Sequence, residues 1–220
     1  FYDGEHIFFE KDDGRFFPNQ FIMLVSNSNE KKSALARFVN YESKLERVIE
    51  CKDSVWGLKP RNKEQTFALD LLNRSDIPII TLVGKAGCGK TLLAIAAGLD
   101  QVLEKQQFKK LIVSRPVQPL GKDIGYLPGT MEEKMRPWLM PIQDNIDFLL
   151  NGQSKSMEMF FEDGTIQIEA LTYIRGRSIS NAFVIIDEAQ NLTIHELKTI
   201  ITRVGENTKI VLTGDIEQID

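Results

Sequence analysis

The sequence predicts an α/β fold, in which a parallel sheet is flanked by helices and preceded by a small β-rich segment. Three observations support this prediction. Apolar runs of strand length alternate with helical stretches from Pro60 onward, which is typical of a parallel sheet. A glycine-rich turn joins one of these runs to a helix. Short apolar runs and turns dominate the first fifty or so residues, so we expect one unit over 1–56 and a second over 57–220.

The composition is that of a globular protein with a slight acidic excess. Of 220 residues, 42% are hydrophobic and 26% are charged, and the net charge is −4. This charge disfavours a protein that coats nucleic acid broadly, although it leaves room for a local basic channel. Two cysteines form neither a disulfide framework nor a zinc pattern, which suits a reducing, cytoplasmic location. We expect no membrane span and, because the chain starts at Phe1 and stops just after a strand, a fragment cut at both ends.

The amino-terminal segment has three predicted elements. The runs HIFF (6–9) and FIMLV (21–25) are separated by a turn-rich stretch and predict a hairpin or small meander. The stretch 26–40 predicts a helix, and a further strand is expected over 45–49. The helix prediction rests on a capping serine, Ser26 or Ser28, and on apolar residues near helical spacing, Leu35, Phe38 and Val39.

The larger segment alternates helices and strands. The first predicted helix starts at Arg61 and must end before Pro78. Five continuous apolar runs predict parallel strands with both faces covered: 79–83, 111–114, 165–169, 183–187 and 209–213. Helices are expected between them over 90–105, 131–150 and 193–204. The expected core residues include Phe67, Leu71, Leu92, Leu93, Phe148 and Leu149, and Trp138 is expected in the core or in an interface.

The turn after the first of these strands has the composition of a phosphate-binding loop. Its fixed positions follow the pattern G-x-x-x-x-G-K-[ST], filled by Gly84, Gly89, Lys90 and Thr91. Glycines let backbone N–H groups point at phosphates, and the helix that follows presents its positive end to them. A glycine-rich link without a ligand is the alternative, but the strand before the turn and the helix after it favour the phosphate site. The predicted nucleotide-binding residues are Gly84, Lys85, Ala86, Gly87, Cys88, Gly89, Lys90, Thr91 and Leu92.

Two acids at the end of a buried run suggest how a metal and a water would be held. Asp187 and Glu188 follow the run 183–186, and ligands in such folds bind at the carboxyl ends of the strands. We expect Thr91 and Asp187 to hold Mg²⁺, and Glu188 to position the attacking water. A solvated acidic turn is the alternative reading.

Polar residues beyond the acids predict contacts with the γ-phosphate. Gln190 either senses this phosphate and reports hydrolysis or caps the helix expected near Thr193. Asp215 and Gln218 follow the last strand, at the same edge of the sheet as Lys90 and Asp187, and are predicted to act as sensors too. Cys88 is either a redox-sensitive thiol or simply a small residue that the loop tolerates.

These motifs resemble two related groups of ATPases. The DEAQ segment with the later TGDxxQ segment resembles the first motor domain of superfamily-one helicases, and Gln65 matches the glutamine with which those enzymes read adenine. A longer resemblance is to the PhoH-like ATPases. It is carried by GKAGCGKTLLA, by the central stretch that starts with SRPVQPLGKDIGYLPG, and by VLTGDIEQID, and it covers about residues 58–220.

The resemblance implies a RecA-like P-loop fold and Mg²⁺-dependent ATP hydrolysis coupled to RNA unwinding, translocation or processing. It also implies ring-shaped homo-oligomers, such as hexamers, in which one subunit completes its neighbour's site. Some members of the family carry an amino-terminal PIN ribonuclease domain, joined by a β-rich segment like 1–56 here. The acids such a nuclease needs are not found before Gly57, so a PIN domain would have to precede Phe1.

Several other residues leave alternatives open. Arg115 suits either a nucleic-acid phosphate contact or a surface salt bridge, and the loop 121–129 with Tyr126 suits nucleic-acid stacking, a lid or an interface. The histidines, His6 and His195, are too far apart in pattern to predict a metal site, and His195 is expected on an exposed helical face. An arginine finger has four candidates and no favourite: Arg136, Arg175, Arg177 and Arg203.

Two rival functions compete with an RNA-coupled ATPase. One is a nucleotide-gated assembly module without nucleic-acid activity. The other is a small-molecule kinase, which the γ-phosphate sensors near Asp215 disfavour because a kinase needs an acceptor pocket at that place.

Overall fold

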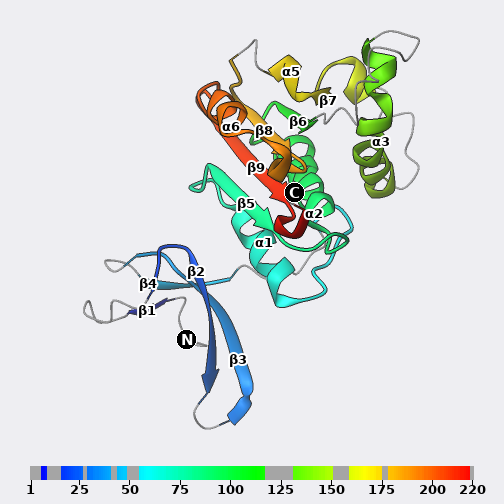
Figure 1. Ribbon diagram of the computed structural model, residues 1–220. Helices are drawn as coiled ribbons and strands as arrows, with labels where there is room; N and C mark the ends of the chain where they lie inside the picture. Colours follow the sequence, from blue (N-terminus) through cyan, green and yellow to red (C-terminus); the bar gives the residue numbers. More distant parts are fainter. Residues whose placement is uncertain are drawn as a thin grey trace. The chain divides into compact units, whose positions relative to one another are not determined.

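The computed structural model divides the chain into two compact units, shown in Figure 1. The first comprises Phe1–Lys52 with Pro60–Asp70, and the second Asp53–Lys59 with Leu71–Asp220. The predicted domain boundary after residue 56 stays a prediction. The structure describes residues 6–8, 16–26, 29–40, 44–48, 55–116, 131–150, 159–174 and 178–218.

The first unit contains an antiparallel sheet, as the β-rich prediction requires. Its strands follow the spatial order β1-β4-β3-β2. The bounds are β1 His6–Phe8, β2 Gln20–Ser26, β3 Asn29–Phe38 and β4 Lys44–Arg47. Ala36 and Phe38 of β3 form a small core with Leu45 of β4. Phe21 stacks on Phe67 of helix α1 (Lys63–Asn73), with ring centroids 4.3 Å apart.

Two predictions about this unit are wrong. The predicted helix over 26–40 is strand β3, which pairs with β2 from Gln20↔Phe38 to Ser26↔Asn29. The ladder satisfies the backbone of both strands, and this non-local gain outweighs a weak helical spacing of apolar residues. The runs near 6–9 and 21–25 are not neighbours either, because β1 pairs with β4 and lies at the opposite edge from β2.

A buried cation ties the first unit together. Arg37 is 1% exposed, and its guanidinium lies 2.8 Å from Glu46 and 3.9 Å from Asp70. It also hydrogen-bonds the side chain of Asn19. A buried charge is tolerated only with partners of this kind. The cluster therefore links β3 to β4 and to helix α1 (Lys63–Asn73).

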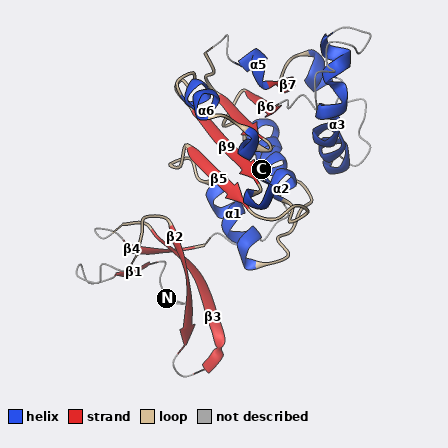
Figure 2. Cartoon of the chain, in the orientation of Figure 1, coloured by secondary structure: helices blue, strands red, loops and turns tan. Residues whose placement is uncertain are grey.

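The second unit is built on a parallel sheet, so the predicted α/β fold is confirmed (Figure 2). All five predicted runs are strands, in the order β5-β9-β8-β6-β7. Their bounds are β5 Ile79–Val83, β6 Lys110–Arg115, β7 Ile166–Ala170, β8 Ala182–Ile186 and β9 Thr208–Gly214. Parallel pairing brings their carboxyl ends to one edge, where the predicted site residues lie.

Helices cover both faces of this sheet. On one face, α2 contacts β6, β8 and β9, and α3 contacts β6 and β7. On the other face, α5 and α6 contribute to a hydrophobic core with side chains from the strands. This core consists of Ile112, Leu171, Ile174, Ile179, Ala182, Val184, Ile186, Ile200 and Ile210. The bounds are α2 Lys90–Leu99, continued by π-helical η1 Asp100–Glu104, α3 Met131–Leu149, α5 Leu171–Ile174 and α6 Ile194–Ile201. Short 3-10 turns are η3 Ala189–Asn191 and η4 Ile216–Gln218. Thr193 and Glu196 form a capping box that starts α6.

Burial follows the predicted core with some exceptions. Every residue of β8 is buried, as are Leu93 and Leu149, whereas Phe67, Leu71, Leu92 and Trp138 are half-buried. Phe148 is 63% exposed, so its placement in the core was wrong. The buried face of α3 carries Ile142, Ile146 and Leu149 at helical spacing, and Phe148 falls outside it. β5 is an edge strand whose alternate residues Ile79 and Val83 are about half exposed, at 46% and 54%.

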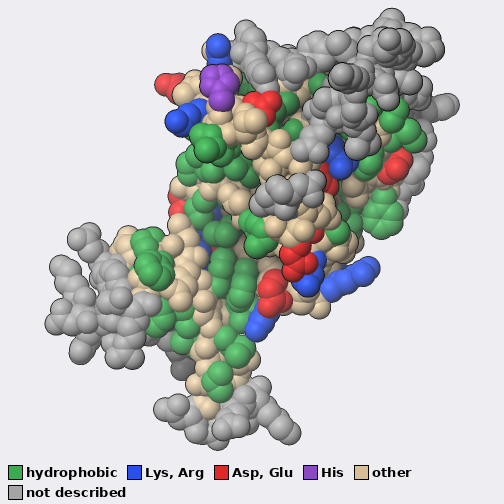
Figure 3. Space-filling model, viewed as in Figure 1, with side chains coloured by type: hydrophobic (Ala, Val, Ile, Leu, Met, Phe, Trp, Pro, Cys, Tyr) green, Lys and Arg blue, Asp and Glu red, His purple; other side chains and the backbone are tan. Residues whose placement is uncertain are grey.

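Charged side chains of the described residues are scattered over the face shown in Figure 3. On the face shown in Figure 3, the Lys and Arg side chains of the described residues lie among acidic ones and form no continuous basic patch. Within the same described part of the chain, no helix has the length and apolar character that crossing a membrane requires.

A buried lysine joins β9 to the end of α1. Lys209 is 1% exposed, and its ammonium donates hydrogen bonds to the backbone oxygen of Leu72, at 2.8 Å, and to that of Arg74. Burial lowers the pKa of Lys209 from 10.5 to about 8, against an opposing effect of Asp76. The charged form is therefore stabilised less in the folded chain than in the unfolded one.

We expect Lys209 to make unfolding pH-dependent. Between about pH 8 and 10.5 the unfolded chain holds a proton at Lys209 that the folded chain has released, so the free energy of unfolding should rise with pH. Lys209→Met should remove this rise and should lower stability by about 1–3 kcal/mol at pH 7, because two carbonyls lose their donor. Urea unfolding over this pH range measures both effects. Lys198→Met, at an exposed position on α6, is the control, and an undiminished rise in the Lys209 variant would contradict the prediction.

Candidate functional site

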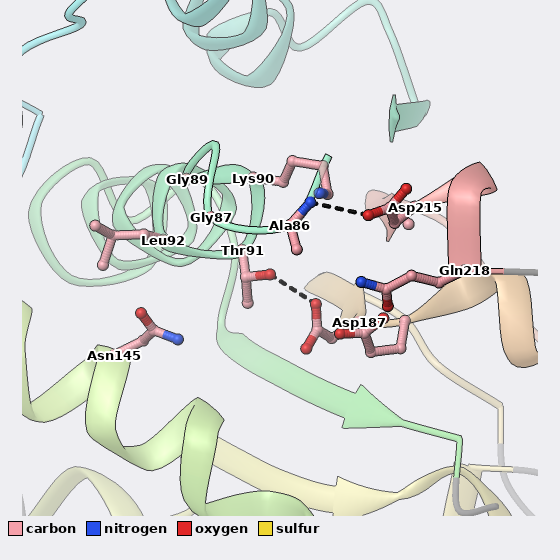
Figure 4. Close-up of a pocket in the computed structure, with 12 residues that line it drawn as sticks. Ala86, Gly87, Gly89, Lys90, Thr91, Leu92, Asn145, Asp187, Asp215 and Gln218 are labelled. Carbon is pink, nitrogen blue, oxygen red and sulfur yellow. Dashed lines mark hydrogen bonds between the residues drawn. The ribbon is translucent and has the colours of Figure 1, made fainter. Parts of the chain in front are cut away.

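A pocket lies at the carboxyl edge of the parallel sheet (Figure 4). Its lining comes from the turn after β5, the start of α2, the middle of α3 and the segments after β8 and β9. The lining residues are Ala86, Gly87, Gly89, Lys90, Thr91, Leu92, Asn145, Asp187, Glu188, Gly214, Asp215 and Gln218. The sheet topology thus unites three motifs that are up to about 130 residues apart in the sequence.

The turn between β5 and α2 has the backbone of a phosphate loop. Gly87 and Gly89 have φ angles of 77° and 87°, a left-handed conformation that favours glycine. Gly89 directly precedes α2, so the amino-terminal end of this helix opens into the pocket. The Lys90 ammonium donates to the backbone oxygens of Gly84, at 2.5 Å, and Lys85, at 2.9 Å. These contacts place the ammonium at the turn itself.

A hydroxyl and a carboxylate meet where the metal was predicted. The Thr91 hydroxyl donates to Asp187 Oδ1 at 2.7 Å, which Figure 4 marks with a dashed line. A second hydroxyl, from Thr213 on β9, donates to the same oxygen at 2.6 Å. Asp187 is 6% exposed, and its own N–H donates to the Ser114 oxygen of β6. The carboxylate is therefore held by hydroxyls from α2 and β9, and the backbone of Asp187 is held by β6.

The residues fit Mg²⁺ bound together with a nucleotide. Mg²⁺ prefers oxygen ligands and keeps several waters, so one carboxylate and one hydroxyl beside substrate phosphates suffice. Thr91 and Asp187 supply these oxygens. In the described ranges no cluster of three or more His, Cys, Asp or Glu could hold a metal by itself. These oxygen ligands therefore suit a metal ion that binds together with the phosphates of a nucleotide.

Glu188 is held in an unusual backbone conformation with both carboxylate oxygens engaged. Its φ angle is 53°, a left-handed value that is uncommon for a residue with a side chain. Gln190 Nε2 donates to Glu188 Oε2 at 2.6 Å, and Arg115 Nη2 lies 3.3 Å from Oε1. Gln190 therefore contacts the acid that was predicted to position water, and the helix cap expected as its alternative role is supplied by Thr193.

Asp215 braces the phosphate loop. Its Oδ2 accepts from the Ala86 N–H at 2.8 Å, and its Oδ1 accepts from Glu217 at 2.9 Å. Its own N–H donates to Gln190 Oε1 at 3.1 Å. Gly214 allows this approach, because a Cβ there would lie 3.0 Å from the same Gln190 oxygen. Asp215 thus connects the loop to Gln190.

The structure brings most of the predicted site residues together. Lys90, Thr91, Asp187, Glu188, Asp215 and Gln218 all line the pocket, and Gln190 lies directly behind Glu188. Cys88 is exposed and, like Gly84 and Lys85, does not line it. Gln65 belongs to the first unit, where its Oε1 accepts from the Arg61 N–H at 2.8 Å, so its adenine-reading role stays a prediction.

Three residues at the site were not predicted: Gly214 and Asn145 line the pocket, and Thr213 contacts Asp187 without lining it. Thr213 reads as an ordinary strand residue, and only the pairing of β8 with β9 shows that it lies beside Asp187. Asn145 comes from α3, on the other side of the pocket from Asp215 in Figure 4. Nothing in the sequence marks Asn145, because it lies in a helix with no motif of its own.

The remaining candidates have mixed outcomes. His195 is exposed on α6, as expected, and Arg203 is exposed after the same helix. The loop 121–129 with Tyr126, and Arg175 and Arg177, lie outside the described residues, as does the side chain of Arg136. The choice of an arginine finger therefore stays open.

Comparison with known protein families identifies the family of this chain. Residues 57–220 match the sequence profile of the family described as PhoH-like protein. The chain belongs to the PhoH-like family. This match covers the whole parallel sheet and the pocket, so the predicted P-loop NTPase assignment is confirmed.

Relatives of this PhoH-like chain agree with the assignment. Protein PhoH2 of Bacillus subtilis is 54% identical over 207 residues, which are 93% of this chain and 47% of that protein. Protein PhoH2 of Mycolicibacterium smegmatis is 42% identical over 188 residues, 85% of this chain and 42% of that protein. The PhoH-like chain thus spans about half the length of these relatives.

A solved structure shows a distant likeness. The large terminase of a thermophilic bacteriophage is 13% identical, with a TM-score of 0.41 over 71% of this chain and 39% of that one.

We expect Thr213 to support metal-dependent nucleotide binding through Asp187. Thr213→Val keeps the shape of the side chain but removes the 2.6 Å hydrogen bond, so Asp187 should be oriented less well. The affinity for ATP with Mg²⁺ should fall by about 10-fold or more, whereas the affinity for ATP in EDTA should change little. Calorimetric titration with and without Mg²⁺ measures the difference.

Thr81→Val on the exposed side of β5 is the matched control. Equal losses with and without Mg²⁺ would contradict the role of Thr213.

Proposed function

We propose that this chain hydrolyses ATP with Mg²⁺ and that, in the full-length protein, hydrolysis is coupled to work on single-stranded RNA. The observation that carries the hydrolysis proposal is the meeting of three groups in one pocket. These are the phosphate loop, the Thr91–Asp187 pair at 2.7 Å and the Glu188 carboxylate.

Each group has a distinct task in the proposed reaction. Backbone N–H groups of the loop and Lys90 bind the β- and γ-phosphates, and Thr91 and Asp187 hold the metal. Mg²⁺, when bound, would neutralise the negative charge that develops on the phosphates. Glu188 lines the pocket and orients the water that attacks the γ-phosphate, while Asp215 and Gln218 sense this phosphate.

The RNA part of the proposal comes from the resemblance to helicase-like ATPases and to PhoH-like proteins. The described basic side chains on the face shown in Figure 3 are scattered, which favours contact through a few local groups on that face. We propose that the full-length protein forms rings in which subunits complete each other's sites, and that a PIN ribonuclease domain accompanies this chain. A nucleotide-gated assembly module without nucleic-acid activity is the alternative that the next experiment separates.

We expect single-stranded RNA to raise the steady-state ATPase rate of the protein. Binding is measured in parallel by fluorescence anisotropy at moderate salt, because phosphate contacts weaken as salt increases. ATP turnover without any RNA effect or RNA binding would support the assembly module instead. A DNA strand of the same sequence tests the preference for RNA.

Glu188→Gln should separate binding from hydrolysis. The amide keeps the shape of the side chain but cannot accept the proton of the water, so kcat should fall by roughly 10²–10⁴-fold while ATP stays bound. Rapid filtration with radiolabelled ATP measures both the retained nucleotide and its turnover. Glu196→Gln, in the capping box of α6, is the matched control, and unaltered turnover in the Glu188 variant would refute the water-positioning role.

A further inference from the structure

Arg115 contacts the proposed catalytic acid from outside the pocket. It is the last residue of β6, and its Nη2 lies 3.3 Å from Glu188 Oε1. Glu188 lines the pocket but Arg115 does not. The arginine therefore contacts the acid without itself lining the pocket.

The contact leaves Glu188 held on two sides. Arg115 binds one carboxylate oxygen and Gln190 Nε2 binds the other at 2.6 Å. The backbone of Glu188 is in the left-handed region, with a φ of 53°, so the pair of contacts fixes a conformation that few residues adopt freely. A water that attacks a phosphate needs a carboxylate oxygen aimed into the pocket, and here both oxygens already have protein partners.

The same contacts continue to the phosphate loop. Gln190 Oε1 accepts from the Asp215 N–H at 3.1 Å, and Asp215 Oδ2 accepts from the Ala86 N–H at 2.8 Å. Arg115, Glu188, Gln190, Asp215 and Ala86 thus form one continuous line of polar contacts. A movement of the Arg115 side chain can therefore affect the phosphate loop through four contacts, and a movement of the loop can affect Arg115 through the same contacts.

We propose that Arg115 is a positioning residue that holds Glu188 at rest, and that a backbone phosphate of bound nucleic acid releases Glu188 by taking Arg115 as its own partner. The inference rests on the proposed function, because Arg115 matters only if Glu188 positions the attacking water. Binding of nucleic acid at the sheet edge would then start hydrolysis without touching the nucleotide.

The chemistry of the pair makes this exchange feasible. The Arg115 and Glu188 side chains are 24% and 28% exposed, and an ion pair with this much access to water contributes little to stability. A guanidinium matches a phosphate as well as a carboxylate, because its planar fork can donate two hydrogen bonds to either. A phosphodiester held nearby by other contacts can therefore compete for Arg115.

The test is ATPase kinetics of Arg115 variants with and without single-stranded RNA. For Arg115→Ala we expect the basal kcat to rise about threefold, as when one ion pair of ordinary strength is lost, with the KM for ATP unchanged. RNA should no longer stimulate this variant. Arg115→Lys keeps the charge and should restore both the low basal rate and part of the stimulation. Arg115→Ala combined with Glu188→Gln should be as slow as Glu188→Gln alone.

Lys105→Ala is the matched control, since Lys105 pairs with Asp100 at the far end of α2, at 2.6 Å. A basal kcat of Arg115→Ala at or below the wild-type value would overturn the inference, as would an equal rise in Lys105→Ala. Stimulation of the wild type by inorganic phosphate as strong as that by RNA would overturn the assignment to nucleic acid. Absence of any hydrolysis by the wild type would instead refute the proposed function.

Discussion

The Asp187 carboxylate lies at the end of a fully buried strand, where a charge is stable only with close partners. Two hydroxyls supply them, one from the start of α2 and one from β9. Both depend on strand register, because a shift of one residue would turn Thr213 or Asp187 to the opposite face. The pairing of β8 with β9, from Ala182↔Thr208 to Ile186↔Leu212, therefore places the Asp187 carboxylate, the proposed metal ligand, beside Thr213.

Beside Asp187, a second set of polar contacts connects other residues of the site. Asp215 accepts a hydrogen bond from the Ala86 N–H, and Gln190 contacts both Asp215 and Glu188. Arg115, at the end of β6, contacts Glu188. Each of these polar groups thus has a partner within the chain. Under the proposed function, exchange of these hydrogen bonds links the pocket to the sheet edge.

The sequence allowed the parallel sheet and most of the pocket to be predicted, because both leave local signals. Continuous apolar runs mark the strands, and the spacing of Gly84, Gly89 and Lys90 marks the loop. The features that were wrongly predicted or not predicted are determined by contacts between residues that are distant in the sequence. Strand β3 is determined by its pairing with β2, and Thr213 becomes a site residue only through its neighbour Asp187. The positions of Gln190 and Arg115 around Glu188 likewise follow from the sheet and not from any motif.

The left-handed backbone at Glu188 explains how two consecutive acids can serve one pocket. In an extended strand, neighbouring side chains point to opposite faces, so an acid after Asp187 would face away from the nucleotide. The φ of 53° ends this alternation immediately after β8, and both acids line the same cavity. The turn thus places the two proposed tasks, metal holding and water orientation, on adjacent residues of one strand end. Any substitution that relaxed this backbone toward the extended form would separate the two tasks in space even if both carboxylates were kept.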